Sequence, residues 1–431
     1  MSTTTSGLAS AAPDHDITPT VRERGWKNAI IFAVLGLIAP LAFGLGSPAG
    51  ATSTFEVTLP DAVLFIEPIG VPSQTAALAL GLLCLALAGF AVFRELRGFR
   101  TPRTVAAVFG VAWVLSFLCW AVADKSISMV GLLQGSLLLA VPLVFGALSG
   151  VLSERAGVIN IAIEGQLLAG AFLSAVVASV SDNVYLGLLA APVAGLLIGL
   201  LLAVFTIRYV VDQIIVGVVL VVFVVGLTSF LYGRLLAPQA DVFNTPETFS
   251  SIAIPLLSDI PLLGAVLFEQ SIIVYLMYGA VALVHVAIFH TRWGLRVRSV
   301  GEHPQAADTV GINVYRTRFR QVALGGAMAG LGGAFFTLGQ VGAFGEQMTS
   351  GKGFIALAAM IFGRHRPLGA LGAALLFGFA DNLQSYLSII GTPIPSQFML
   401  MVPYLVTVFA VAGLVGRHRP PAAIGRPYIK S

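Results

Sequence analysis

The chain has 431 residues, of which 57% are hydrophobic and only 10% are charged, and its formal net charge is +4. Because a soluble domain carries about 25% charged residues, this composition excludes a soluble globular protein and predicts a surface covered largely by lipid. The two cysteines, Cys84 and Cys119, both lie inside apolar runs, where they are expected to pack as small apolar side chains and not to form a disulfide or a metal site.

The first residues are polar. Residues 1–27 are rich in serine and threonine and end in the basic stretch RERGWK, and we expect them to form a disordered cytoplasmic tail. The first apolar run, 28–45, is followed by small residues, as a signal peptide would be. Its long polar lead and the many apolar runs that come later favour an uncleaved membrane anchor.

Apolar runs then follow one another along the chain. A helix of about 20 apolar residues crosses a bilayer, and the runs near this length are 28–45, 74–93, 104–123, 131–150, 158–180, 185–207, 213–232, 271–289, 320–338, 368–388 and 398–416. A shorter run, 354–363, is expected to be a broken or re-entrant helix. The sequence therefore predicts an all-α, polytopic membrane bundle of about 10–12 transmembrane helices, with one group in 28–130 and a second in 131–416.

The basic residues predict the orientation of these helices, because lysine and arginine collect in cytoplasmic connections. With the N-terminus inside and the short run crossing, 21 of the 24 lysines and arginines fall inside, and the outside segments hold only Lys125, Arg234 and Lys352. We therefore expect a multi-pass protein of the plasma membrane with both termini, including the tail 417–431, in the cytoplasm. The polar segment 290–320 is then cytoplasmic too.

This polar segment contains a short helical pattern. Pro304 suits the first turn of a helix, His303 stands at the N-cap position and Gly311 is placed to end the helix. A helix of about two turns that carries Ala306 and Ala307 is too short to be stable alone. One interpretation is docking into a groove of another protein; the other is a solvated loop whose arginines only fix the topology.

Three stretches of the sequence resemble one family. GEHPQAADTVGINVYRTR, in the polar segment, resembles the coupling-helix region of ABC importer permeases of the sugar, nucleoside and branched-chain amino acid superfamily. SERAGVINIAIEGQLLAGAF and GKGFIALAAMIFGRHRPLGALGAALLFGFADNLQ are similar to two further signatures, and the closest match is to the nucleoside-uptake subgroup. The resemblance covers about 131–416 and fits 1–130 less well, and His303 stands where an asparagine is expected.

The resemblance implies that 131–416 is the core of a permease subunit, not an enzyme, in an ATP-driven nucleoside importer. It implies four partners: a cytoplasmic ABC ATPase, a second permease subunit in a heterodimer, a substrate-binding lipoprotein and a small-molecule solute, with no nucleic acid. The sequence has no G-x-x-x-x-G-K-[ST] phosphate loop, so we expect ATP to be used by the partner and no cofactor in this chain. The histidines show no metal-ligand spacing, so we expect no metal. The residues expected to couple to the ATPase are Glu302, His303, Pro304, Gln305, Ala306, Ala307, Asp308 and Gly311.

Two acids lie deep inside apolar runs, where acids are costly and usually face an interior. Glu164 follows Glu154 by ten residues, which on a continuous helix places it about 15 Å deep, and Asn160 would share its face. Asn160, Glu164 and Gln166 either line a translocation path or form a buried polar network between helices. For the second acid, Asp381, an interhelical tie or a subunit interface is favoured over a place in the path.

The remaining candidates are aromatic and glycine residues. Phe344 and Phe354 flank the segment before the short run and could stack on a nucleobase, although phenylalanine is also ordinary apolar filler. A face of small residues on the run 320–338 predicts close helix packing; its members are Gly325, Gly326, Gly330, Gly332 and Gly333.

Two alternatives to a nucleoside importer remain. One is an ABC permease for a simple sugar or another small polar solute. The other is a stand-alone secondary transporter in which the two deep acids serve proton coupling, although such a transporter has no use for a docking segment. An intramembrane enzyme is disfavoured because the sequence offers no paired histidines, no facing acids and no metal-ligand spacing.

Overall fold

The computed structural model describes residues 26–60, 64–99, 101–391, 401 and 420–430. Most of the predicted tail 1–27, and all but one residue of the predicted span 398–416, therefore lie outside the described residues. The described part is mainly helical, with two small sheets of short strands that the all-α expectation did not include.

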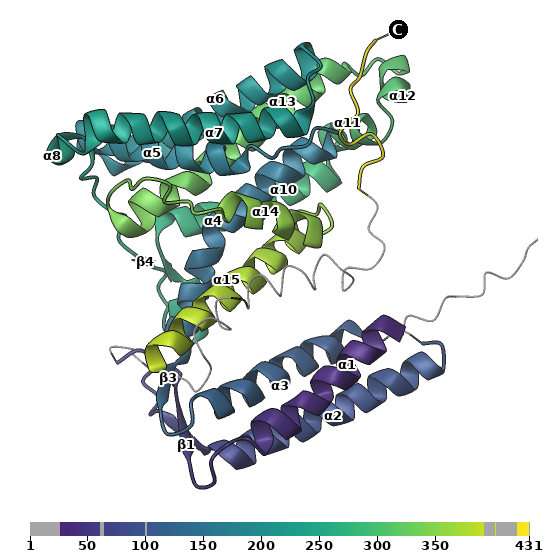
Figure 1. Cartoon of the computed structure of the whole chain (residues 1–431), viewed down its shortest axis with the longest axis vertical. Helices are drawn as coiled ribbons and strands as arrows, with labels where there is room; N and C mark the ends of the chain where they lie inside the picture. Colours follow the sequence, from purple (N-terminus) through teal and green to yellow (C-terminus); the bar gives the residue numbers. More distant parts are fainter. Residues whose placement is uncertain (1–25, 61–63, 100, 392–400, 402–419, 431) are drawn as a thin grey trace, which may run out of the picture.

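Three helices and a small sheet form an N-terminal unit (Figure 1). Its elements are α1 (Trp26–Ile38) with the π-helical extension η1 (Ala39–Gly44), α2 (Ser73–Leu96), α3 (Arg103–Ala121), β1 (Thr52–Glu56), β2 (Ile69–Pro72) and β3 (Ser126–Ser128). The interior of the unit is aromatic, with Phe43 packed edge-on against Trp113 and Phe117. Strand β1 pairs antiparallel with β2 and parallel with β3, so the sheet connects this unit to the next helix.

The larger second unit is a bundle of long helices. They are α4 (Met129–Arg155), α5 (Ile163–Ser181), α6 (Val184–Ala203) with η2 (Val204–Arg208), α7 (Gln213–Leu231) with η3 (Tyr232–Leu236), α10 (Ile272–His290), α13 (Val314–Ala334) with η4 (Phe335–Val341), and α15 (Pro367–Ile390). Lys125 joins the two units, because its ammonium donates to the carbonyls of Ile390 and Gly391 at the end of α15.

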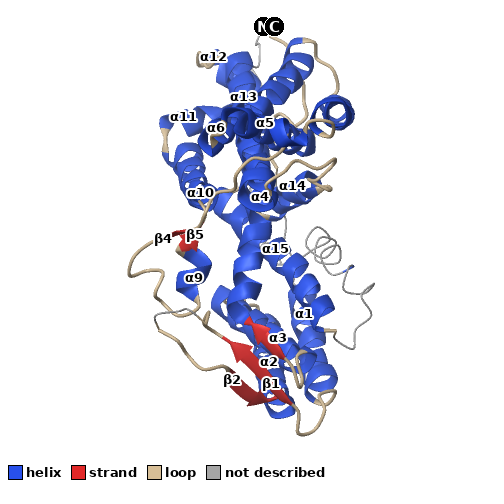
Figure 2. Ribbon diagram, turned by 90° about the vertical axis from the view of Figure 1, so that its left-hand side faces the viewer, coloured by secondary structure: helices blue, strands red, loops and turns tan. Residues whose placement is uncertain are grey.

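The long helices run from one side of the molecule to the other, and short elements lie at both sides. One side carries α8 (Ala240–Phe243), β4 (Ile252–Ala253), α9 (Leu263–Leu267) and β5 (Glu269–Gln270), together with β1–β3. The other carries α11 (Arg292–Glu302), α12 (Pro304–Thr309) and the C-terminal residues 420–430 (Figures 1 and 2). The helix α14 (Lys352–Phe362) lies inside the bundle, against α4 and α15.

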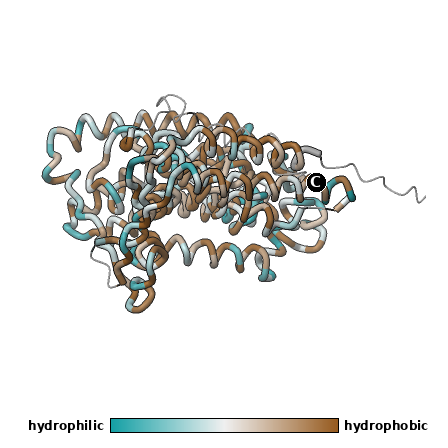
Figure 3. The backbone as a smooth tube through the Cα atoms, turned by 90° about the horizontal axis from the view of Figure 1, so that it is seen from below, coloured by the Kyte–Doolittle hydropathy of each residue, from teal (hydrophilic) through white to brown (hydrophobic). Residues whose placement is uncertain are grey.

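Eight helices in the described part of the chain, α2–α7, α10 and α13, are long and apolar enough to cross a membrane. The run formed by α1 and η1 is shorter, and α15, which carries Asp381 and Asn382, is not among the eight. Apolar residues follow the length of the helices (Figure 3), and many large ones, such as Leu189 and Val222, are exposed. The expectation of a polytopic helical membrane protein is confirmed.

Glycines allow the backbone of α13 to contact the backbones of α5 and α6 directly. A Cβ atom on Gly326 would lie 2.3 Å from the carbonyl oxygen of Gly195 in α6, and one on Gly333 would lie 2.0 Å from the carbonyl oxygen of Leu167 in α5. No L side chain fits at such distances. The predicted close packing of this small-residue face is therefore confirmed.

One sequence-based expectation about the backbone is wrong. The run 158–180 is not helical from its start, because residues 156–162 form an irregular connection and α5 begins only at Ile163. Gly157 has φ +89°, a left-handed conformation that ends α4 and that glycine adopts without strain. Asn160 and Glu164 therefore share no helix face, and the depth calculated along one continuous helix does not apply.

Candidate translocation and coupling sites

The carboxylate of Glu164 holds the beginning of α14. Its Oε1 accepts hydrogen bonds from the hydroxyl of Thr349 at 2.7 Å and from the backbone N–H of Gly351 at 2.8 Å, and its Oε2 accepts one from the N–H of Gly353 at 2.6 Å. Glu164 itself lies in the first turn of α5 and is 6% exposed. Its charge thus sits at the N-termini of two helices, where helix dipoles favour an anion.

The glycines at the start of α14 make this contact possible. Gly351 has φ +80° and turns the chain into the helix. A Cβ on Gly353 would lie 2.5 Å from the Cα of Glu164, so only glycine allows the two backbones to approach. The stretch Gly351-Lys352-Gly353 is visible in the sequence, but its contact with Glu164 was not predicted. The sequence does hold a clue to this contact: a lone acid in an apolar run, and a short apolar helix whose start is flanked by glycines and could bind an anion.

Asp381 pairs with Lys352. Their side chains form an ion pair and are only part-exposed, so α14 is tied to α15. Asn382 donates a 2.7 Å hydrogen bond to the carbonyl of Leu132, which ties α15 to α4. The interhelical tie favoured for Asp381 is present, and Lys352, assigned to an outside connection, is part of this tie. A role for Asp381 in the solute path stays a prediction.

Asn160 and Gln166 form a closed amide pair on the other side of the α4–α5 connection. Asn160 donates to Gln166 Oε1 at 3.1 Å and accepts from Gln166 Nε2 at 3.3 Å. Both side chains also contact the hydroxyl of Ser149 in α4, and all three residues are fully buried. In this structure the two amides tie the connection to α4, while Glu164 is directed toward α14. Of the three residues predicted together, two form a network and the third does not join it.

The two phenylalanines predicted to contact a base lie in different surroundings. Phe344 is 2% exposed, and its ring packs edge-on against Phe172 at 5.2 Å. Its backbone is held at both ends by the side chain of Asn244. Phe354, on α14, is 47% exposed. Only Phe354 therefore presents a ring surface in this structure, and base stacking by either residue stays a prediction.

A buried hydrogen bond between His365 and Glu154 marks the other end of α14. His365 Nε2 and Glu154 Oε2 are 2.7 Å apart, and both side chains are almost fully buried. Arg155 donates to the backbone carbonyls of Arg364 and His365, which both have left-handed backbone angles in the turn before α15. Since α14 has 11 residues, about 15 Å separates this turn from the Glu164 end. Glu164 is therefore buried far from this turn along α14, and its depth in the membrane stays a prediction.

The expected short helix in the polar segment is confirmed as α12. His303 caps it by accepting the N–H of Ala306, Pro304 is its first residue, and Gly311 follows it with φ +84°. The exposed side carries Ala306 and Gln305, whereas Ala307 is only 3% exposed and faces the protein.

The C-terminal residues 420–430 pack onto this region, a contact that the sequence did not reveal. The phenol of Tyr428 is 6% exposed and lies against Ala307, Val300 and Val314. Burial raises the pKa of Tyr428, and hydrogen bonding to Asp308 raises it further.

Hydrogen bonds fasten the segment 420–430 to three places. The N–H of Ala423 donates to the carbonyl of Gly301 at the end of α11, and the N–H of Gly425 donates to the carbonyl of Gly157 in the α4–α5 connection. Arg318 of α13 donates to the carbonyl of Arg426 at 2.9 Å. The segment 420–430 therefore links the α12 region to the connection that leads to Asn160 and Glu164.

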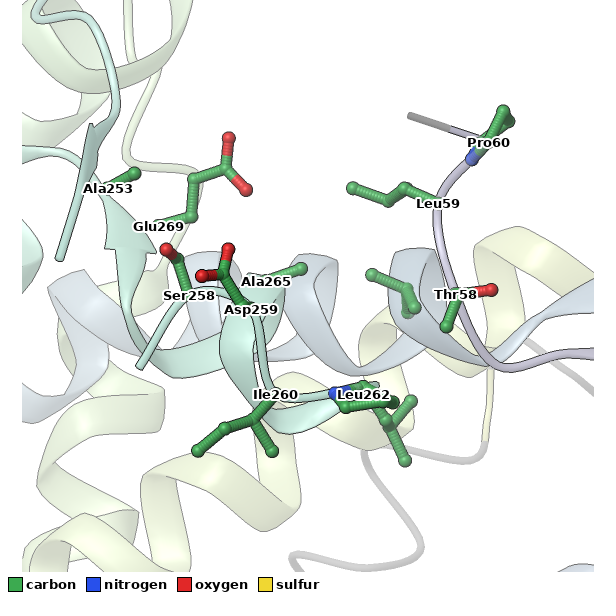
Figure 4. A pocket seen from close by; sticks show the side chains of 12 residues that line it. Thr58, Leu59, Pro60, Ala253, Ser258, Asp259, Ile260, Leu262, Ala265 and Glu269 are labelled. Carbon is green, nitrogen blue, oxygen red and sulfur yellow. The ribbon is translucent and has the colours of Figure 1, made fainter. Parts of the chain in front are cut away.

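A separate hollow of about 360 Å³ lies on the opposite side, between the segment after β1 and the β4–β5 region. Figure 4 shows the carboxylates of Asp259 and Glu269 on one wall, with Leu59 and Thr58 across from them. None of the predicted path residues lines this hollow.

The features together define a class: a multi-pass helical membrane protein with a broken helix held in its interior by a buried carboxylate and with a short amphipathic helix pair at one face. Residues 132–411 match the family described as "Branched-chain amino acid transport system / permease component". The chain belongs to this permease family. The match begins after the N-terminal unit, in agreement with the weaker resemblance of 1–130.

Two relatives match nearly throughout their own length. The chain is 43% identical to the guanosine ABC transporter permease protein NupQ of Bacillus subtilis, over 69% of this chain and 96% of that protein. It is 38% identical to the nucleoside ABC transporter permease protein NupC of Lactococcus lactis, over 68% and 95%. A putative glucose ABC transporter permease protein, TsgC13 of Haloferax volcanii, is 34% identical over 59% and 77%. No solved structure matches.

Proposed function

We propose that this chain is a permease subunit of an ATP-driven importer of nucleosides and that it forms the translocation path with a second, different permease subunit. The observation that carries the proposal is the identity of 43% and 38% to two nucleoside permeases over nearly their whole length. Two such systems each contain two related permeases, NupP with NupQ and NupB with NupC, which supports a heterodimer here.

The proposed energy source is a separate cytoplasmic ABC ATPase that docks on α12. The exposed Ala306 and Gln305 form the small outer face of a helix whose inner face is fixed by Tyr428 and by the end of α11. A helix that is packed against the protein on one side and exposed on the other can transmit a movement of the ATPase to the rest of the chain without unfolding. With the ATPase on α12, the proposed orientation has both termini in the cytoplasm and the β4–β5 region on the outer side, facing the proposed substrate-binding lipoprotein.

The proposed gate in the path is α14. Its first residue, Lys352, is held by Asp381, its second residue, Gly353, by Glu164, and the turn after its end by the contact of His365 with Glu154. Broken helices at membrane depth are tolerated where they line a cavity or are buried in protein, and half-helix N-termini serve as polar sites in transporters. The exposed ring of Phe354 on the same helix supplies an apolar surface for a base.

The test is uptake of radiolabelled guanosine and uridine in a host strain with this gene deleted and in the same strain with the gene restored. Uptake that depends on the gene, and that unlabelled nucleosides inhibit but free bases and ribose do not, supports the proposal. A second candidate, a sugar permease, is supported by the 34% identity to the glucose permease relative. Gene-dependent uptake of glucose or ribose without nucleoside uptake would establish that candidate and refute the first.

A further inference from the structure

A pocket of about 890 Å³ opens beside the end of α6 and the start of α13, on the side of the bundle that carries α12. Its charged lining consists of three arginines, Arg208 at the end of η2 and Arg316 and Arg320 on α13. Its other walls are aliphatic and aromatic and include Phe319 and Ile429. The pocket thus joins a cluster of positive charge to an apolar surface.

The three guanidinium groups are exposed, and among the described residues none of them forms an ion pair. Two acids of adjoining segments are engaged elsewhere. Asp212 accepts the N–H groups of Ile214 and Ile215 at the start of α7, and Asp308 pairs with Lys430. Three unpaired arginines that line one pocket create a strong positive potential, which an anion would neutralise.

The surroundings of the pocket are those of a helix end at the edge of a membrane. The residues that follow Arg208 are exposed and apolar: Tyr209 is 67% exposed and Ile215 is 61% exposed. Apolar side chains directly beside arginines match the depth at which acyl chains end and phosphate groups begin. Guanidinium groups suit phosphate because they can donate two parallel hydrogen bonds.

We propose that this pocket binds the headgroup phosphate of an anionic phospholipid in the leaflet on the α12 side. The arginines contact the phosphate, and the acyl chains lie along the apolar wall. A free phosphate ion would gain nothing from the apolar wall, whereas a lipid uses both parts of the lining. The proposal depends on the chain being a membrane protein and not on the identity of the transported solute.

The test uses the purified full chain in nanodiscs of phosphatidylcholine that contain a small fraction of phosphatidylglycerol with a photoactivatable group in its acyl chain. Cross-linked peptides are identified by mass spectrometry, and unlabelled lipids compete for the site. We expect cross-links near residues 204–211 and 315–320, displaced by phosphatidylglycerol and not by phosphatidylcholine. Inorganic phosphate is a further competitor, because displacement by it at low concentration would make a free ion the ligand and overturn the proposal.

A matched pair of double variants tests the charges. Arg316→Gln/Arg320→Gln removes two pocket arginines that are four residues apart on α13, and Arg292→Gln/Arg296→Gln removes two exposed arginines with the same spacing on α11, outside the pocket. A charge near an anionic surface contributes about fivefold in affinity, so the first variant should lose about 25-fold and the second should lose little. Equal losses would overturn the proposal, as would cross-links that form in nanodiscs but are blocked in native membranes by a protein partner.

Discussion

Glu164 Oε2 accepts a 2.6 Å hydrogen bond from the backbone N–H of Gly353, which joins the first turn of α5 to the first turn of α14 across 189 residues of sequence. Movement of α14 away from α5 would expose a buried carboxylate and two backbone N–H groups. The contact therefore holds the two helices together in an apolar interior. Its hydrogen bonds can break without a large cost only where water or a polar solute replaces them.

Substitution of Glu164 should separate a structural role from a transport role. Glu164→Ala leaves the Thr349 hydroxyl and two N–H groups without an acceptor, and we expect a loss of about 3 kcal/mol or more in stability. Glu164→Gln keeps one acceptor oxygen, so the protein should assemble while uptake falls. The measurements are thermal unfolding in detergent, protein level in the membrane and nucleoside uptake per assembled complex. Normal uptake per complex in both variants would remove Glu164 from the path.

Gly353 should tolerate no larger residue. Gly353→Ala places a Cβ 2.5 Å from the backbone of Glu164, and overpacking of this kind typically costs about 1–3 kcal/mol. Gly372→Ala, in the first half of α15 but beyond its first turn, is the matched control, since nothing lies within 4 Å of its new Cβ, and it should gain about 0.5–1 kcal/mol in stability. Similar unfolding temperatures for the two variants would show that α14 does not approach α5 as described.

The sequence predicts those features of this fold that depend on local patterns. Apolar runs gave the long helices, and the proline and glycine that flank α12 gave its bounds almost to the residue. The glycine face of α13 was visible because the helical repeat places its members together. In each case the informative residues lie within a few turns of one another.

Other features depend on partners far away in the chain. The stretch around Asn160 is apolar enough to resemble a helix, but hydropathy reports burial and not backbone shape, so the irregular connection 156–162 was missed. Glu164, which accepts the hydrogen bonds from the N-terminus of α14, lies 189 residues away from Gly353, and no local sequence pattern identifies it. Residues 417–431 were expected to be only a cytoplasmic tail. The docking of the part around Tyr428 was not predicted, because its docking surface on α12 and α11 is formed only in the folded protein.

Cysteine accessibility should establish the orientation of the chain. The distribution of the basic residues predicts that α12 lies inside and that the connection before β4 lies outside. Thr309 and Thr248 are both exposed, and the natural cysteines, Cys84 and Cys119, are buried, so single introduced cysteines will dominate the labelling. A cysteine at Thr248 should react with a membrane-impermeant thiol reagent in intact cells, and one at Thr309 only after lysis. The reverse pattern would refute the orientation and, with it, docking of the ATPase on α12.

A large side chain on the outer face of α12 should uncouple ATP hydrolysis from solute transport. Ala306→Trp puts a large side chain on the exposed side of the helix, and a misfit in a packed interface costs about 1–3 kcal/mol, which corresponds to roughly a 5- to 150-fold weaker association with the ATPase. Ala306→Ser is the control, because it adds only one oxygen atom. The measurement is co-purification of the ATPase together with solute-stimulated ATP hydrolysis in liposomes. Normal association and normal coupling for the tryptophan variant would place the docking site elsewhere.

Tyr428 should determine how firmly α12 is held. Its side chain packs in one buried cluster with Ala307, and the segment around it contacts Gly157 and Gly301. Removal of the ring takes away these contacts, so Tyr428→Ala should raise local opening of residues 420–430 and α12 by roughly tenfold or more. Hydrogen exchange measured by mass spectrometry on these peptides tests this expectation, while peptides of the long helices should be unchanged.

The same variant should show whether the C-terminal segment takes part in coupling. A loosened α12 would move without moving the α4–α5 connection, so ATP hydrolysis should continue while solute uptake per ATP falls. Tyr428→Phe keeps the ring and removes only the bond to Asp308, and it should retain most of the coupling. If Tyr428→Ala accelerates exchange but leaves uptake per ATP at its normal value, the segment is a structural support only and takes no part in coupling.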